Sequence, residues 1–163
     1  MLRGRILPRI IAPLLALLGA ITVGLLGAGP LFPLPSDTIL INEVDAETPG
    51  TDTAEFIELY DGGSGHTNLD GLVVVFFNGQ DDRAYRTFDL AGHQTNSDGY
   101  FLLGNESVAG VDLVFPDNVL QNGPDAVALY CGQASEFPAG TAVTGNNLQD
   151  ALVYDSDDPD DPG

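Results

Sequence analysis

Basic residues, cysteine and histidine are scarce in this chain of 163 residues. Lysine is absent, so the five basic residues are all arginines. The one cysteine, Cys131, cannot form a disulfide within the chain. It ends the apolar run 127–131, and we interpret it as a small, half-buried apolar side chain. Two histidines, His66 and His93, are too few for a histidine-rich metal cage.

The arginines are unevenly distributed, and their positions divide the chain into a basic N-terminal segment and an acidic body. Three of them lie in the first nine residues, no acidic residue precedes Asp37, and residues 10–35 carry no charge. A basic start followed by an apolar run is typical of a secretory signal peptide or an N-terminal membrane anchor helix. We predict that residues 1–35 are one of these, with a buried core helix as the remaining alternative. Both targeting interpretations imply that the rest of the chain is exported, either secreted or at the cell surface.

Residues 36–163 contain all 24 acidic residues and only two arginines, Arg83 and Arg86, which gives this body a formal charge of −22. Binding to a nucleic-acid backbone depends on Lys and Arg, so this charge argues against a direct nucleic-acid partner. Asp81 and Asp82 are expected to neutralise both arginines through local ion pairs. The 12 aromatic residues of the body argue against disorder, because they supply apolar mass for a core.

Eight short apolar runs, separated by clusters of Gly, Asn, Asp and Pro, predict strands between turns. The expected fold class of residues 36–155 is therefore all-β: one domain, an antiparallel β-sandwich of about eight strands, with a barrel as the alternative. Ile57 and Leu59 should face the core, whereas Glu55 should be a solvated strand end. Residues 72–77 are apolar on both faces and predict a central strand covered on both sides. The eight runs are residues 38–45, 55–61, 69–78, 84–90, 99–104, 111–115, 125–131 and 151–155.

Four short motifs follow one another along the body. An I-N-E strand, an E-F-I-E-L strand, an L-x-G turn and an L-x-N-x-x-D-x-V-x-L segment lie at residues 41–43, 55–61, 69–71 and 120–129. In this order they resemble the lamin-tail domain family. The resemblance covers residues 38–155 and implies an immunoglobulin-like β-sandwich. It also implies a context, because bacterial members are commonly exported and often accompany nuclease, phosphatase or other hydrolase domains, or belong to surface proteins.

The sequence contains no established catalytic motif. The nearest approach to a G-x-S-x-G elbow, residues 62–66, has His66 in place of the last Gly. His66 and His93 lie in Gly-rich polar stretches and are expected to be exposed; a catalytic pair would require their two loops to meet. The polar groups near the first strands, such as Asn42 and Glu55, are interpreted as hydrogen-bonding partners that fix strand register, with a ligand-facing role as the alternative.

The acidic residues 156–163, together with Asp155, offer hard oxygen ligands of the kind that Ca²⁺ prefers. No EF-hand loop fits, because a proline stands at the required fifth position. We therefore predict a solvated acidic linker or tail, with loose Ca²⁺ binding as the alternative. Asp81 and Asp82 are a second place where Ca²⁺ could bind. The candidate metal ligands of the tail are Asp155, Asp157, Asp158, Asp160 and Asp161.

These observations predict a non-catalytic, exported binding or structural module that positions a partner domain or mediates contacts with a protein or cell-surface partner. The membrane would be contacted only through the N-terminal segment. Two alternatives stay open. Because residues 156–163 have the composition of a linker, the body could be the N-terminal accessory domain of a longer extracellular nuclease or phosphatase, whose catalytic activity would lie beyond residue 163. It could also be a Ca²⁺-dependent adhesion module.

Overall fold

A computed structural model describes residues 39–47 and 51–154. The predicted targeting segment, residues 1–35, and the acidic tail, residues 156–163, lie outside this range. Within the described residues, no helix is long and apolar enough to cross a membrane.

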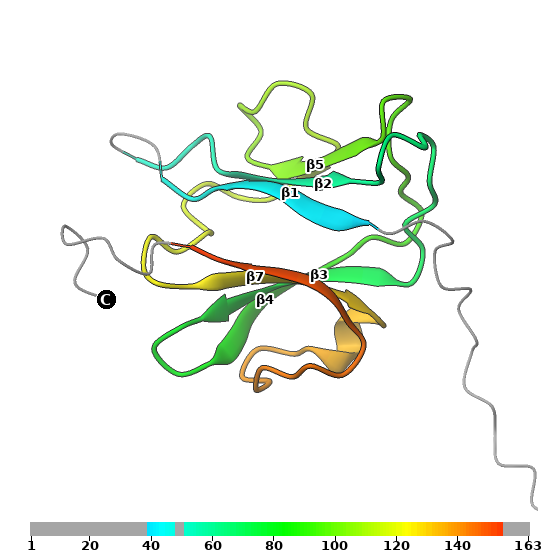
Figure 1. The fold of residues 1–163 in the computed structure, drawn as a ribbon. Coiled ribbons are helices and arrows are strands. Elements are labelled where there is room, and N and C mark those ends of the chain that lie inside the picture. The colour runs from blue at the N-terminus through cyan, green and yellow to red at the C-terminus, as the bar shows by residue number, and fades with distance from the viewer. Residues whose placement is uncertain (1–38, 48–50, 155–163) are drawn as a thin grey trace, which may run out of the picture. The chain divides into compact units, whose positions relative to one another are not determined.

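In the part of the chain that the structure describes, eight strands form two four-stranded sheets that pack face to face as a β-sandwich (Figure 1), which confirms the expected all-β sandwich. The first sheet has the strand order β1-β2-β5-β6 and the second has the order β4-β3-β7-β8. Each strand overlaps one of the eight predicted runs. The strands are β1 (Leu40–Asp45), β2 (Phe56–Tyr60), β3 (Leu72–Asn78), β4 (Arg83–Asp89), β5 (Tyr100–Gly104), β6 (Leu113–Val114), β7 (Ala126–Cys131) and β8 (Leu148–Val153).

One strand pair departs from the antiparallel arrangement that was expected. β6 runs parallel to β5, whereas the other pairs in the described part of the chain are antiparallel. The connection from β5 folds back so that Asp112 bonds the edge of β5 before β6 begins. The Asp112 carboxylate accepts from the Leu102 N–H at 2.9 Å, and the Asp112 N–H donates to the Leu102 carbonyl. β6 itself is two residues long.

The main core lies between the two sheets. Ile57 and Leu59 of β2 are fully buried, as their alternation with polar residues predicted. From the second sheet, Phe76 packs edge-to-face against Phe115 with ring centroids 5.9 Å apart. Aliphatic and aromatic side chains from both sheets thus share one apolar layer, and their burial is the main force that holds the sheets together.

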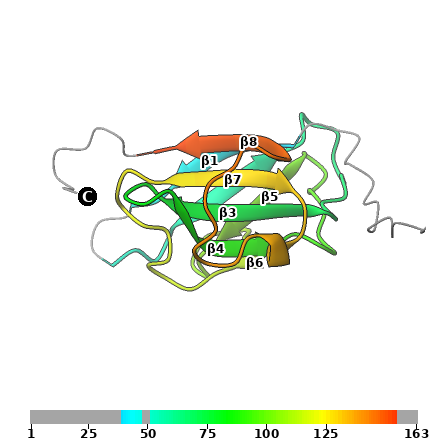
Figure 2. The same cartoon turned by 90° about the horizontal axis from the view of Figure 1, so that it is seen from below.

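A second apolar cluster covers the outer side of the second sheet. The chain after β7 forms a single 3₁₀ turn, η1 (Ala134–Glu136), and places the ring of Phe137 4.5 Å from that of Tyr130. Figure 2 shows this segment lying across the sheet. Residues 72–77 are consequently buried on both faces, which confirms the doubly covered strand predicted from their unbroken apolar run.

Side chains and loops form hydrogen bonds at the sheet edges, where unpaired backbone groups would otherwise be able to pair with another chain and cause aggregation. The edge of β4 bonds the segment after η1, where Ala84 donates to Thr141 and accepts from Gly140. At the edge of β8, the Asp150 carboxylate accepts the N–H groups of Ile41 and Ala151 at 2.8 and 2.9 Å. One acidic side chain therefore ties β8 to β1 and joins the two sheets along that side.

Truncating Phe137, which packs on Tyr130, should show how much the second apolar cluster contributes to the free energy of unfolding. Phe137→Ala is expected to lower the free energy of unfolding by about 3 kcal/mol, because it deletes a buried ring and leaves a cavity against Tyr130. Val143→Ala, which truncates a side chain that is 55% exposed, should change it by less than about 0.5 kcal/mol. Urea unfolding followed by circular dichroism would measure both. Equal effects of the two substitutions would contradict the packing role of Phe137.

Candidate functional site

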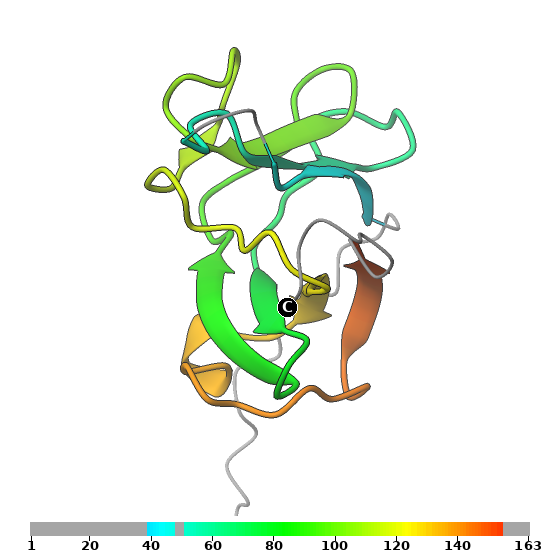
Figure 3. The same ribbon diagram turned by 90° about the vertical axis from the view of Figure 1, so that its left-hand side faces the viewer.

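Residues 115–125, hereafter the crossing segment, connect the two sheets. They leave β6 at the edge of the first sheet and enter β7 inside the second (Figure 3). A segment between layers cannot form regular strand bonds along its length, so other groups must satisfy its backbone. Some of those groups are backbone carbonyls, such as those of Asp52 and Gly104, and the others are buried or half-buried polar side chains.

Glu55 makes the central contacts to the crossing segment. One carboxylate oxygen, Oε1, accepts from the N–H of Leu120 at 3.0 Å. The other, Oε2, accepts from the N–H of Val119 at 3.1 Å and from the amide of Asn105 at 3.2 Å. Burial raises the pKa of Glu55; the bonds from Val119 and Asn105 oppose this rise, and the nearby charge of Asp52 adds to it.

The solvated position predicted for Glu55 is wrong, because its side chain is fully buried. Glu55 lies just before β2, at the position where the crossing segment presents two backbone N–H groups to the first sheet. A carboxylate can accept several such bonds, and this offsets the cost of removing it from water. The interpretation of this residue as a structural hydrogen-bonding partner is confirmed.

Asn105 supports the same junction from the end of β5, and sequence reasoning did not identify it. Its side chain is fully buried, and its Oδ1 accepts from the Glu55 N–H at 2.6 Å. Its Nδ2 donates to the carbonyl of Pro116 at 3.0 Å. An asparagine directly after an apolar strand was the available signal, but asparagine is also common in exposed turns.

Two tyrosines fix the next residue of the crossing segment. The N–H of Gln121 donates to the hydroxyl of Tyr85 at 3.1 Å, and the hydroxyl of Tyr154 donates to the carbonyl of Gln121 at 3.0 Å. Burial raises the pKa of Tyr85 to about 12 and also raises that of Tyr154, so both stay protonated at neutral pH. The main chain of Gln121 is thus held on both sides, and its side chain remains available to line a pocket.

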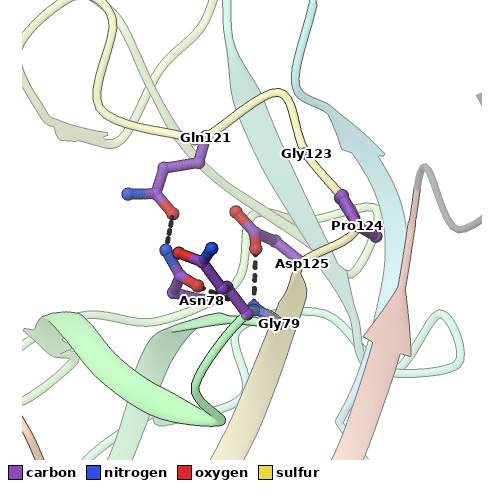
Figure 4. A pocket seen from close by; sticks show the side chains of 7 residues that line it. Asn78, Gly79, Gln121, Gly123, Pro124 and Asp125 are labelled. Carbon is purple, nitrogen blue, oxygen red and sulfur yellow. Dashed lines mark hydrogen bonds between the residues drawn. The ribbon is translucent and has the colours of Figure 1, made fainter. Parts of the chain in front are cut away.

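A pocket of about 350 Å³ opens between the β3–β4 turn and the end of the crossing segment (Figure 4). Its walls are joined by short hydrogen bonds: the N–H of Gly79 donates to Asp125 Oδ1 at 2.7 Å, and Asn78 Nδ2 donates to Gln121 Oε1 at 2.9 Å. Only glycine fits at position 79, because an added Cβ would lie 1.8 Å from the carbonyl oxygen of Pro124. The lining residues are Asn78, Gly79, Gln80, Gln121, Gly123, Pro124 and Asp125.

A second buried carboxylate, Asp61, organises the loop after β2. Its two oxygens accept five bonds of 2.7–3.0 Å, from backbone N–H groups and from two hydroxyls. Burial alone would raise its pKa, but these bonds outweigh burial and the pKa is lowered. The donors are Gly63, Ser64, Gly65, Thr67 and Thr95. All of them belong to the two loops that contain the histidines.

The two histidine-bearing loops do meet, through backbone bonds that include His66 N–H to Asn96 and Leu69 N–H to the His93 carbonyl. His66 is exposed, as expected. His93 is half-buried instead of exposed, because its ring packs 5.2 Å from that of Phe101. Within residues 39–47 and 51–154, no group of three or more His, Cys, Asp or Glu side chains could hold a metal ion.

The five aspartates proposed as Ca²⁺ ligands in the tail, from Asp155 onward, lie outside the described residues. At the other proposed place, Asp81 accepts from the backbone N–H of Arg83 at 3.2 Å. The guanidinium of Arg83 donates to the carbonyl of Gly140 at 2.9 Å, so this arginine stabilises the loop that covers β4. Cys131 is half-buried and packs against the main core, which agrees with the expected apolar role, and its thiol also donates a hydrogen bond to Gln149.

Comparison of the chain with protein-family models, with curated proteins and with solved structures gives no match.

The two buried carboxylates should affect the pH dependence of stability in opposite directions. Asp61 has a lowered pKa, so its stabilisation is complete above the ordinary value of 3.8 and is lost as the pH falls through the lowered pKa. Glu55 has a raised pKa, so the free energy of unfolding should fall as the pH rises from 4.5 through the raised value. Asp61→Asn should remove the first effect, and Glu55→Gln the second.

Urea unfolding between pH 2.5 and 7.5 would measure both effects, with Asp98→Asn as the control for loss of an exposed acidic charge. At pH 7, Asp61→Asn is expected to cost about 2–3 kcal/mol, because an amide NH₂ then faces donors. An acid-side slope of Asp61→Asn identical to that of the control would contradict the role given to Asp61.

Proposed function

We propose that the chain is a non-catalytic, exported binding and structural module of the lamin-tail type, with an immunoglobulin-like sandwich. It positions a partner domain or mediates contacts with a protein or cell-surface partner. The observation that carries this proposal is that the buried carboxylate and amide side chains form hydrogen bonds to loops of the protein itself. Glu55, Asp61 and Asn105 bond backbone and hydroxyl groups of these loops, which is the role expected of residues in a scaffold.

Catalysis of hydrolysis requires side chains that can reach a substrate, which differs from the structural hydrogen bonding seen here. A nucleophile or an activated water needs a general base within hydrogen-bond reach, and that base must be able to exchange protons with the substrate. Glu55 is sealed beneath Val119 and Leu120, and Asp61 beneath the glycine-rich loop and two threonines. Their oxygens accept hydrogen bonds from backbone N–H groups, two threonine hydroxyls and the Asn105 amide, so they support loop geometry and not proton transfer to a ligand.

The positions that carry the lamin-tail resemblance support the same proposal. Residues 41–43 lie on β1 and residues 55–61 span β2, and these two strands pair antiparallel. Asn42 donates to Glu58 across this pair at 2.7 Å, at the place where a bulge shifts the register. Polar residues of the motif thus fix strand alignment, which is a structural use of their chemistry.

The full chain, kept in a mild neutral detergent because of its apolar N-terminal run, provides the test. We expect no turnover of chromogenic phosphodiester, phosphomonoester or glycoside substrates, with or without Ca²⁺. Turnover that disappears in Glu55→Gln or Asp125→Asn would contradict a non-catalytic role; Asp98→Asn serves as the matched control.

Export is tested separately on intact producing cells. A protease added outside should degrade the body, because the proposal places residues 36–163 on the outer side of the membrane or in the medium. Full protection of the body in intact cells, with cleavage only after lysis, would contradict export.

A further inference from the structure

The outer face of the first sheet carries apolar side chains that no core contains. The buried residues of β2 and β5 point into the main core, so the side chains that alternate with them lie on the opposite face. These side chains are half-buried and belong to neither apolar cluster. Val114 of β6, which follows the core-facing Leu113, is 53% exposed on the same side. The apolar residues of this surface, hereafter the aromatic face, are Phe56, Tyr60, Tyr100, Leu102 and Val114.

The second sheet shows how this fold covers an outer face. There the segment that contains η1 and Phe137 lies across the sheet, and Tyr130 beneath it is fully buried. Among the described residues, no strand or helix lies on the outer side of the first sheet, which is the upper layer in Figure 1. An apolar patch left open on one sheet is typical of a surface that meets a partner.

Two tyrosines form an ordered pair on the aromatic face. Tyr60 and Tyr100 lie directly opposite each other on β2 and β5, and their rings stack with centroids 4.6 Å apart and planes 26° apart. The stack orders both rings and leaves each ring one face that its partner does not cover. Tyrosine rings supply a large contact area at a low cost in conformational entropy, and they are enriched at protein interfaces.

Acidic side chains lie among these apolar residues. Glu58 alternates with Phe56 and Tyr60 along β2, at about 7 Å along the strand from each. Glu43 of β1 is exposed and lies directly opposite Glu58. Like charges at opposed positions destabilise a strand pair. The Asn42 amide donates to Glu58 at 2.7 Å, but it is neutral and cannot cancel either charge.

The charge of the protein selects the partner. Both arginines of the described residues, Arg83 and Arg86, lie on β4 of the other sheet. A second copy of the chain would bring another body of charge −22 and is therefore repelled, as is an anionic surface, whereas a basic partner is attracted. Among basic side chains, arginine fits best, because its planar guanidinium stacks on aromatic rings and also pairs with carboxylates.

We propose that the aromatic face is a docking surface for an arginine-rich segment of a basic protein partner. Arginine side chains of the partner stack on Tyr60 and Tyr100, and their guanidinium groups pair with Glu58 and Glu43. The other apolar residues of the face contact the aliphatic parts of the segment. This assignment rests on the proposed binding role and names the partner for it by its chemistry.

Two short peptides of equal length and charge test this chemistry, one of alternating arginine and glycine and one of alternating lysine and glycine. Each is titrated into the ¹⁵N-labelled full chain in neutral detergent micelles at physiological ionic strength, where salt screens the attraction of distant acids. The amide signals of Glu58 and Leu102 report on the aromatic face, and that of Ala128 reports on the second sheet. The arginine peptide should shift the first two signals and bind about threefold more tightly than the lysine peptide.

Substitutions separate stacking from charge. Tyr100→Leu removes one ring of the pair, so it should abolish the advantage of the arginine peptide over the lysine peptide, whereas Tyr100→Phe keeps the ring and should retain it. Glu58→Gln keeps an oxygen that can accept from Asn42 but removes the charge, so it should weaken both peptides alike, by about fivefold.

The matched controls belong to the second sheet. Asp82→Asn removes an exposed acid from the β3–β4 turn, at a positive φ of 55° that asparagine tolerates. Val153→Ala truncates an apolar side chain of β8 that is 67% exposed. Both should change the affinity for either peptide by less than about twofold. A far-ultraviolet circular dichroism spectrum and a thermal melt of each variant show that its fold is retained.

Several results would overturn the assignment. They are equal affinity for the two peptides, an arginine advantage that persists in Tyr100→Leu, or the same loss in Asp82→Asn as in Glu58→Gln, which would mean diffuse attraction by the whole body. Displacement of the arginine peptide by the neutral oligosaccharide cellohexaose would assign the face to carbohydrate, and self-association that Tyr100→Leu abolishes would assign it to a second copy. None of these results produces substrate turnover, so failure of the partner assignment remains distinguishable from failure of the non-catalytic role.

Discussion

The carboxylate of Glu55 accepts hydrogen bonds from two consecutive backbone N–H groups, and the position of the crossing segment, residues 115–125, depends on this contact. Val119 and Leu120 donate to its two oxygens from the segment that passes from one sheet to the other. Buried backbone groups without partners are costly, and apolar side chains cannot satisfy them. The hydrophobic layers supply the attraction between the sheets, whereas Glu55 determines the path by which the chain crosses between them.

The consequences extend from this contact to the surface. Once Leu120 is fixed, Gln121 falls between the hydroxyls of Tyr85 and Tyr154, and the chain then turns toward β7. The pocket forms where this segment meets the β3–β4 turn, at a point where only a glycine allows the two backbones to approach. Binding residues in loops are accurately placed when a rigid framework supports them. Here the framework consists of buried polar groups as well as packed strands.

The layered β-fold could be predicted from the sequence because it depends on a short-range pattern. Residues 72–77 form an unbroken apolar run, and the structure covers both of their faces. The burial of Glu55 could not be predicted, because alternation along β2 says nothing about a backbone segment 64 residues away that needs an acceptor. The pocket was not predicted for a related reason: its lining combines residues near 78 with residues near 123, and polar residues in turns look the same whether they line a pocket or face water.

Amide hydrogen exchange of Val119 and Leu120, measured residue by residue in the full chain, tests the central role of Glu55 most directly. If the Glu55 carboxylate holds these two N–H groups, they should exchange slowly in the natural chain and at least tenfold faster in Glu55→Gln, while the amides of β3 keep their protection. Fast exchange of both amides in the natural chain, or protection that is unchanged in Glu55→Gln, would contradict the account.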